Sequence, residues 1–451
     1  MSSAKKRSPR LPIILIGALF AAIVMLPFLI STGSSRKAPA VSGKTETLVI
    51  VSPHRREVRL EYSRGFAAWM KEKHGRGVSI EWLDVGGTSK ILKDLESRYA
   101  KTPNNPGVDM LFGGGVDPFL SARDQGWLDT VAVPPDTLAA IPSSCGGSPV
   151  YDTGGTWFGV ALSGFGIIYN KKILSRLGIA EPRTWEDLGR PEYFTWIASG
   201  DPRSSGSVHM CYELIMQTMG YEKGWALITR LSANVRRFGE GGGVAPNEVA
   251  AGEVALGMAI DQYAQTVIDI HGREQLSFVL PKGATTIGAD AIAVLRNAPS
   301  RSLAVLFLDY VLSEQGQRIL FTPAGMNGQK HALYRLPVRK ALYSDANAPA
   351  ARPYDDPGGF IYDQKKGSRR RKILADLIGV CLIDQHDDLA RAWKSIIRSG
   401  MDDARIRRLC TPPVTEEELD SAAREWKDPR KRLTRMTAWA KLSAERYREE
   451  R

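Results

Sequence analysis

Short apolar runs alternate along the chain with stretches whose apolar residues recur every three or four positions. From Thr47 onward, runs typical of buried strands cover residues 47–53, 78–85 and 107–114. Each run is followed by a turn and an amphipathic stretch that predicts a helix. Three strand–loop–helix units in succession predict a parallel sheet with crossover helices. Such sheets bind ligands in the loops at the carboxyl ends of their strands.

The middle of the chain repeats this alternation. Strands that run into helices are predicted over 157–178, 194–220 and 254–272, with another helix over 222–234 and extended segments within 276–295. Residues 302–321 have the period of one long amphipathic helix. Helices are also predicted over 369–400 and 411–426, followed by a final basic helix. The pattern therefore predicts an α/β fold with a helical C-terminal region.

The first 44 residues read as a targeting segment rather than as part of the fold. A basic tip, residues 5–10, precedes the uncharged apolar run Leu11–Ile30. This pattern is typical of a secretory signal peptide, and about twenty apolar residues also suffice to span a bilayer. No small-x-small cleavage site follows Ile30, which favours an uncleaved anchor followed by a tether over 31–44. We expect the rest of the chain to be periplasmic or extracellular, and either released or anchored to the cytoplasmic membrane.

Composition and charge exclude several classes of function. The chain of 451 residues is 43% apolar, suits two lobes, and has a formal net charge of +12. Its basic excess lies in the N-terminal tip and the tail, without a module that reads nucleic acid, so no nucleic-acid partner is expected. The basic tail predicts solvated helix faces, with attraction to an anionic membrane as the alternative. Four cysteines and six scattered histidines have no metal-ligand spacing, and Cys381 lies in an apolar run typical of a buried thiol.

The stretch ASGDPRSSGSVHM is a candidate anion site at the start of a helix. A strand ends before it and a helical pattern follows, so Ser204, Ser205, Gly206 and Ser207 fall at the helix N-terminus. Serine hydroxyls there cap free N–H groups, and the same N–H groups bind phosphate or carboxylate. Capping and solute binding are equally good interpretations of these residues alone. A nucleophile is not expected, because no G-x-S-x-G motif or activating base accompanies them.

Two further loops after strands carry similar chemistry. In DVGGTSKIL, Thr88 and Ser89 follow a glycine turn at a predicted helix start, without the spacing of a P-loop. In FGGGVDPF, Gly114 and Asp117 follow the third predicted strand. Asp117 precedes a proline and is also typical of a plain helix cap.

Several motifs fall in an order that resembles a known family. They are DPRSSGS, GWALITRLSANV, VAAGEVALGMAIDQYA, FVLPKGATTIGADAIAVLRNAP, FLDYVLSEQGQRIL and LYRLPVRKALY. Together, from about Thr47 to Tyr343, the chain resembles the periplasmic solute-binding proteins of ABC importers, in the cluster for iron(III), thiamine and organophosphate-type solutes. The resemblance implies a type II fold of two α/β lobes with hinge-crossing strands. It implies lobe one over 45–157 and 288–350, lobe two over 158–287, and a C-terminal helical extension over 351–451.

The resemblance also implies where solute contacts lie. The Ser204–Ser207 loop would face the cleft, Ser163 and Phe165 would lie near the lobe crossing, and Asp290 near the returning strand. Core packing explains Ser163 and Phe165 equally well. Iron-binding relatives carry two adjacent tyrosines where this chain has Asp261 and Tyr263 separated by a glutamine. Ferric ion favours phenolate and carboxylate oxygens, so an iron ligand becomes the alternative rather than the first expectation.

We therefore expect an exported binding protein that captures a small anionic solute, bearing phosphate, phosphonate or carboxylate, for an ABC permease. The alternatives are a ferric-iron transport protein and a membrane-anchored ligand sensor or interaction protein. No catalytic residue, resident metal or cofactor is expected, because no nucleophile–base pair or metal-ligand cluster is visible.

Overall fold

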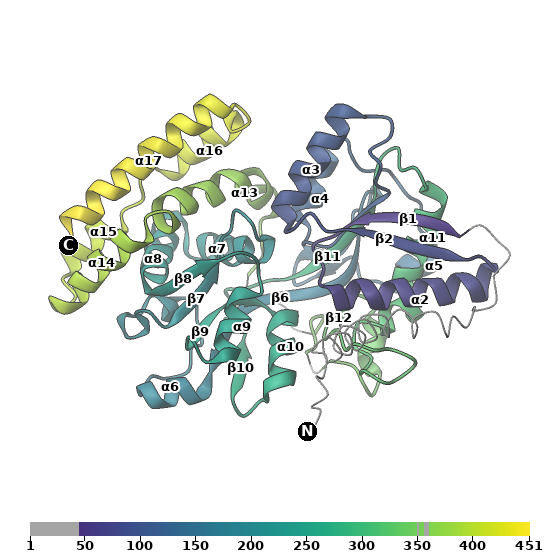
Figure 1. Ribbon diagram of the computed structural model, residues 1–451, viewed down its shortest axis with the longest axis horizontal. Helices are drawn as coiled ribbons and strands as arrows, with labels where there is room; N and C mark the ends of the chain where they lie inside the picture. The colour runs from purple at the N-terminus through teal and green to yellow at the C-terminus, as the bar shows by residue number, and fades with distance from the viewer. Residues whose placement is uncertain (1–44, 350, 356–359) are drawn as a thin grey trace, which may run out of the picture. The chain divides into compact units, whose positions relative to one another are not determined.

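The computed structural model describes residues 45–349, 351–355 and 360–451 (Figure 1). The predicted leader, anchor and tether lie outside these residues, and so does the anchor on which the sensor alternative depends. Within the described part of the chain, no helix is long and apolar enough to cross a membrane.

The first three predicted strands form one side of the sheet. Strand β1 (Glu46–Val51) pairs in parallel with both β2 (Val78–Leu83) and β3 (Met110–Phe112). The connecting helices are α2 (Arg56–His74), α3 (Thr88–Lys101) and α4 (Asp117–Asp124). Helix α2 ends at Gly75, whose φ of 64° lies in the left-handed region that favours glycine. The parallel units read from the sequence are therefore present.

Strand β6 (Phe158–Asn170) connects the two halves of the sheet. All 13 of its residues are buried, and its sequence is apolar or small up to Asn170 at its end. Its residues 158–164 pair with β11 (Ile287–Val294), which also pairs with β3. Its residues 165–169 pair instead with β9 (Leu256–Ile260). The pairing therefore changes partner between Gly164 and Phe165, and the sheet is mixed because β11 and β6 run antiparallel to their neighbours.

The second half of the sheet follows the order β6-β9-β7-β8. Its strands are β7 (Ile197–Gly200), β8 (Val235–Gly239), β9 and β10 (Leu276–Val279). Its helices are α6 (Lys171–Leu177), α7 (Gly206–Met219), α8 (Tyr221–Asn234), α9 (Val244–Ala251) and α10 (Asp261–His271). Strand β8 and helix α9 were not among the predicted elements, because β8 carries two exposed arginines and α9 is a short segment with a proline inside it.

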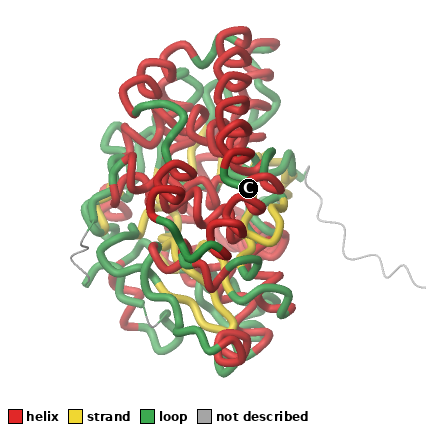
Figure 2. The backbone as a smooth tube through the Cα atoms, turned by 90° about the vertical axis from the view of Figure 1, so that its left-hand side faces the viewer, coloured by secondary structure: helices red, strands yellow, loops and turns green. Residues whose placement is uncertain are grey.

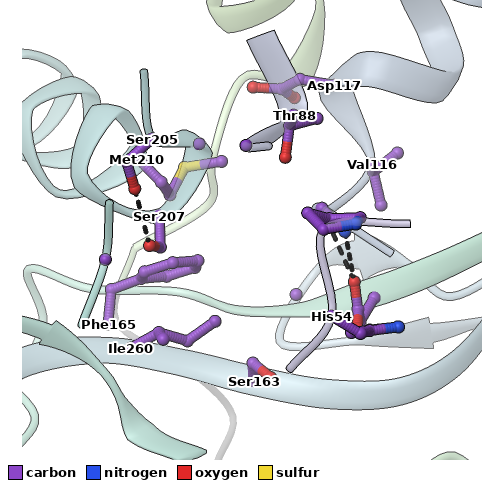
Figure 3. A pocket seen from close by; sticks show the side chains of 18 of the residues that line it. His54, Thr88, Val116, Asp117, Ser163, Phe165, Ser205, Ser207, Met210 and Ile260 are labelled. Atoms are coloured by element: carbon purple, nitrogen blue, oxygen red, sulfur yellow. Dashed lines mark hydrogen bonds and ion pairs between the residues drawn. The ribbon is translucent and has the colours of Figure 1, made fainter. Parts of the chain in front are cut away.

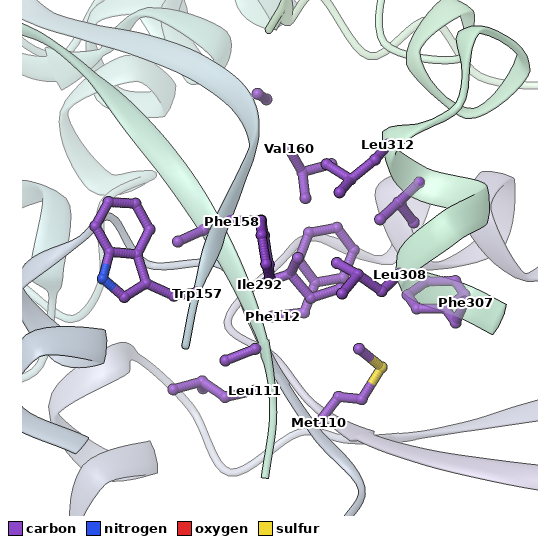
Figure 4. Packing of buried hydrophobic residues seen from close by; sticks show 14 of the residues in the cluster. Met110, Leu111, Phe112, Trp157, Phe158, Val160, Ile292, Phe307, Leu308 and Leu312 are labelled. Carbon is purple, nitrogen blue, oxygen red and sulfur yellow. The ribbon is translucent and has the colours of Figure 1, made fainter. Parts of the chain in front are cut away.

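Two main hydrophobic cores lie on either side of the strand crossing, with a smaller one beside the second. The first contains Phe112, Phe158, Ile292 and Phe307, whose side chains pack where β3, β6, β11 and α11 (Arg301–Leu312) meet (Figure 4). The second forms around α7 and α8, and the smaller third around β9 and α9. Strand β6 contributes residues to both main cores. The lobe boundaries stay a prediction.

The predicted helix over 302–321 is wrong in one respect. The segment forms two helices, α11 (Arg301–Leu312) and α12 (Glu314–Arg318). Ser313 between them is extended, and its hydroxyl accepts the Gly316 N–H at 3.1 Å, which starts the second helix. The remaining short elements are α5 (Pro135–Ala139), the pair β4 (Ser144–Cys145) and β5 (Ser148–Pro149), and β12 (Leu336–Pro337).

The C-terminal helices expose most of their basic residues, as predicted, and they also bury an apolar stripe. They are α13 (Gln364–Ile378), a π-helical turn over 379–383, α14 (His386–Arg398), α15 (Asp403–Cys410), α16 (Glu416–Glu425) and α17 (Pro429–Glu449) (Figures 1 and 2). Leu374, Leu377, Cys381 and Trp393 are fully buried in the second core. Their apolar stripe supplies this burial, while most of the basic residues lie on the outer faces and only Arg370 and Arg371 among those of the described tail are buried. The buried position of Cys381 is as predicted.

Candidate ligand-binding cleft

A cleft at the strand crossing brings together most of the predicted site residues. The cavity has a volume of about 320 Å³ and is lined by both halves of the sheet and by α13 (Figure 3). The predicted residues that line it are Thr88, Gly114, Asp117, Ser163, Phe165, Ser204, Ser205, Gly206, Ser207, Tyr263 and Asp290. Figure 3 shows Thr88 and Asp117 on one side, Ser205 and Ser207 on the other, and Ser163 and Phe165 on the floor.

Two predicted residues do not reach this cavity. Ser89 faces a neighbouring groove beside α13, because it lies one position further around the start of α3. Asp261 is held against β6, where its Oδ2 accepts the Gly164 N–H at 2.9 Å. Burial raises the pKa of Asp261 to about 6. Its position at the first residue of α10 therefore serves to join that helix to the crossing strand.

The start of α7 combines a helix cap with free donors. The hydroxyl of Ser205 accepts the Val208 N–H at 3.4 Å and lies 3.2 Å from the Ser207 hydroxyl. The backbone oxygen of Asp201 accepts the N–H groups of Ser204 and Ser205. The first-turn N–H groups that follow, at Gly206 and Ser207, have no acceptor within the helix. The loop is thus a capped helix start whose positive end opens on the cleft.

The start of α3 faces the start of α7 at close range. A Cβ placed on Gly87 would lie 2.0 Å from the backbone oxygen of Ser204, so only glycine permits this approach. A Cβ on Gly206 would lie 2.9 Å from Thr88 Oγ1. Thr88 is 3% exposed. The two helix N-termini, one from each half of the sheet, are therefore in contact across the cleft.

Asp290 is neutralised by an ion-pair network on the cleft wall. Its Oδ2 accepts a hydrogen bond from Arg335 and lies 2.7 Å from His54 Nε2, which itself lies 3.0 Å from Arg335 Nη1. Its Oδ1 accepts the N–H groups of Gly114 at 2.7 Å and Gly115 at 3.2 Å. Burial alone would raise the pKa of Asp290, but Arg335 and His54 more than offset this and hold it well below its usual range. Asp290 therefore positions the glycine loop and adds no net negative charge to the cleft.

Asp117 lies beside the helix starts, and its pKa is shifted in the opposite direction to that of Asp290. It is 1% exposed, and its Oδ2 accepts the Tyr362 hydroxyl at 2.6 Å. Burial raises the pKa of Asp117 to about 6, although Arg371 and the Tyr362 hydrogen bond oppose the shift. Near neutral pH this carboxyl is therefore close to its titration point.

Asp117→Asn should make the protein less sensitive to rising pH. Because the pKa of Asp117 is raised from 3.8 to about 6, its neutral form contributes stability below pH 4 that is lost as the pH rises through 6. Asparagine keeps an acceptor for Tyr362 and cannot ionise. The free energy of unfolding of the variant, relative to wild type, should rise by up to about 3 kcal/mol between pH 4 and pH 7. Urea unfolding at both pH values measures this, and a difference that does not change with pH would contradict it.

Several cleft residues were not predicted from the sequence. They are His54, Arg59, Ser148, Gln262, Thr286, Tyr362, Gln364 and Arg371. His54 is one of the six scattered histidines, and it pairs with Asp290, which lies 236 positions away. Arg371 is the most consequential omission: it is 7% exposed, and its Nη2 has no hydrogen-bond partner among the described residues. The basic run RRRK was the available signal, and it was read as solvated charge.

Comparison with known proteins identifies the family. A family model described as bacterial extracellular solute-binding protein matches residues 107–332. The chain belongs to this family. The phosphoglycerate transport regulatory protein of Salmonella typhimurium is 30% identical over 162 residues, which are 36% of this chain and 40% of that protein. The solute-binding protein thus matches less than half of the length of this relative.

Solved structures confirm the fold. The periplasmic binding protein AfuA from Actinobacillus pleuropneumoniae, with fructose-6-phosphate bound, has a TM-score of 0.62 at 20% identity and covers 76% of this chain and 99% of its own. Iron-bound HitA from Pseudomonas aeruginosa has a TM-score of 0.55 at 20% identity and covers 73% and 99%. The two-lobed type II binding-protein fold is therefore as predicted, with a helical C-terminal region.

Proposed function

We propose that this solute-binding protein captures a small anionic solute in its interlobe cleft and presents it to an ABC permease in the periplasm. The observation that carries the proposal is the contact between the N-termini of α3 and α7 across the cleft. Each helix start supplies partial positive charge and N–H donors. Thr88, Ser205 and Ser207 add hydroxyl groups to the same space.

The charges around the helix starts also support an anionic solute. Arg59 and Arg371 line the cleft, and Arg55 lies over the ring of Tyr263 with 4.4 Å between its Cζ and the ring centroid. The carboxylate of Asp290 is compensated by Arg335. Asp84 also lines the cleft and pairs with Arg59 at 2.9 Å, while Arg371 has no such ion pair among the described residues. An anion entering the cleft would therefore meet the Arg371 cation and the hydrogen-bond donors of the two helix starts.

The donor set does not favour ferric ion as the solute. Ferric ion is held by anionic oxygens, and burial raises the pKa of the Tyr263 phenol, which opposes phenolate formation. Asp261 is turned away from the cleft to accept the Gly164 N–H. Among the described residues, no group of three or more His, Cys, Asp or Glu side chains could hold a metal ion.

Calorimetric titration of the full chain tests this proposal. The panel holds inorganic phosphate, phosphoglycerate, fructose-6-phosphate, citrate and ferric ion. We expect at least one of the phosphate or carboxylate compounds to bind with a dissociation constant in the micromolar range or below, and ferric ion to bind weakly. Tight binding of ferric ion with no response to the anions would overturn the proposal.

A further inference from the structure

Helix α13 of the C-terminal region contacts both halves of the sheet at the cleft. It packs against α7 and against α4, which lie on opposite sides of the crossing strand (Figure 1). On the α4 side, the Tyr362 hydroxyl donates to Asp117, and the hydroxyls of Ser368 and Ser121 lie 3.1 Å apart. The C-terminal region therefore forms a third wall of the cleft.

A buried ion pair joins α13 to α7. Arg370 and Glu213 form an ion pair of 2.8 Å in which both side chains are completely buried. Gln217 of α7 also accepts the Asp363 N–H at 2.9 Å and donates to the Asp363 backbone oxygen at 3.1 Å. Because these contacts hold α13 along α7, the neighbouring side chain of Arg371 has a defined place beside the start of α7.

Arg371 is buried beside the cleft, and its Nη2 has no hydrogen-bond partner in the described part of the chain. A Cβ on Gly206 would lie 3.1 Å from Arg371 Nη2 and 2.9 Å from Thr88 Oγ1, so the guanidinium and the hydroxyl meet at the first turn of α7. A guanidinium left unpaired in a buried site is costly, and natural structures compensate it with an anion. Asp117 also lines the cleft, and its carboxyl accepts the Tyr362 hydroxyl rather than pairing with Arg371.

We propose that Arg371 is a solute-binding residue and that the C-terminal helices complete a three-sided receptor for a phosphoryl group. This inference rests on the proposed function and deepens it. A carboxylate has two oxygens in one plane, whereas a phosphate monoester or phosphonate has three terminal oxygens that point in different directions. The starts of α3 and α7 and the guanidinium of Arg371 approach one space from three elements, which suits the second arrangement. Arginine binds such oxygens in pairs with charge-assisted hydrogen bonds.

The test compares Arg371→Met and Arg371→Lys with wild type in the full chain. Phosphoglycerate and fructose-6-phosphate are the probes, and glycerate and fructose are their partners without phosphate. We expect Arg371→Met to weaken binding of the phosphate ester by about 10- to 100-fold, since a charge-assisted hydrogen bond is lost. The affinity of Arg371→Lys should lie between those of wild type and Arg371→Met. Glycerate and fructose should each bind wild type more weakly than the matching phosphate ester.

Controls keep the outcomes distinct. Arg369→Met removes a neighbouring arginine that is 53% exposed and pairs with Asp420, so it should leave the affinity unchanged. Thermal unfolding of Arg371→Met should show an intact fold, because methionine replaces an unpaired buried charge. If wild type binds a phosphate ester and Arg371→Met binds it equally well, or if glycerate binds as tightly as phosphoglycerate, this inference is overturned and the proposed function stands. If wild type binds no anion in the panel, the proposed function itself fails.

Discussion

Gly87→Ala is expected to weaken solute binding by at least about 100-fold while the protein remains folded. The added Cβ would lie 2.0 Å from the backbone oxygen of Ser204, across the cleft from α3. A backbone oxygen cannot rotate away as a side chain can, so the two helix starts must separate. The solute would then contact only one helix start at a time. The measured affinity falls in proportion to the fraction of molecules in which the two helix starts are in contact. Calorimetry with the phosphate ester that wild type binds measures the loss.

Gly77→Ala is the matched control for this variant. A Cβ at Gly77 would meet only Thr45 Oγ1, at the ordinary contact distance of 3.8 Å. This variant should bind as wild type does. The backbone of Gly87, with φ of −69°, tolerates alanine, so Gly87→Ala should also keep the unfolding free energy of wild type within about 1 kcal/mol. Unchanged affinity in Gly87→Ala would show that the solute does not require the closed cleft.

Arg370→Met is expected to lower the free energy of unfolding by about 3–5 kcal/mol. It leaves the Glu213 carboxylate completely buried without its ion-pair partner, and breaking a buried pair from one side is strongly destabilising. The pair also joins α13 to α7, so its loss should loosen the wall that carries Arg371. Urea unfolding of the full chain measures the effect.

Two further variants separate charge from packing in this result. The double variant Glu213→Leu with Arg370→Met removes both charges and should recover most of the lost stability. Arg369→Met removes an exposed ion pair and should change the unfolding free energy by less than about 1 kcal/mol. A loss of under about 1 kcal/mol in Arg370→Met would contradict the view that this pair fixes α13 in place.

Helices, strands and helix-start loops whose signals lie within a few neighbouring residues could be predicted from the sequence. The helices ending at Gly75 and Gly178 stop where glycine adopts φ of 64° and 67°, and the apolar strands before them read directly from the period of the chain. The loops with Thr88 and with Ser204–Ser207 were predictable as candidates, because glycine and hydroxyl residues at a helix start have few other uses. The break at Ser313 was not, since its signal is one side-chain cap within an otherwise continuous helical period.

Contacts between segments that are distant in the sequence could not be predicted from local sequence patterns. The network of His54, Asp290 and Arg335 joins three separate parts of the chain, and no spacing relates them. Asp261 lies where the predicted strand of 254–272 runs into its helix, but its carboxyl accepts the Gly164 N–H and does not line the cavity. Arg371 reaches the cleft only because the apolar stripe of α13 docks on α7, which a reading of charge alone does not reveal.

A crystal structure of the full chain with the phosphate ester that binds most tightly in the calorimetric panel tests the central claim most directly. We predict that the phosphorus atom lies at the first turn of α7, with its oxygens within hydrogen-bond distance of the Gly206 N–H, Thr88 Oγ1 and the Arg371 guanidinium. A phosphoryl group bound elsewhere in the cleft, with Arg371 still unpaired, would contradict the account.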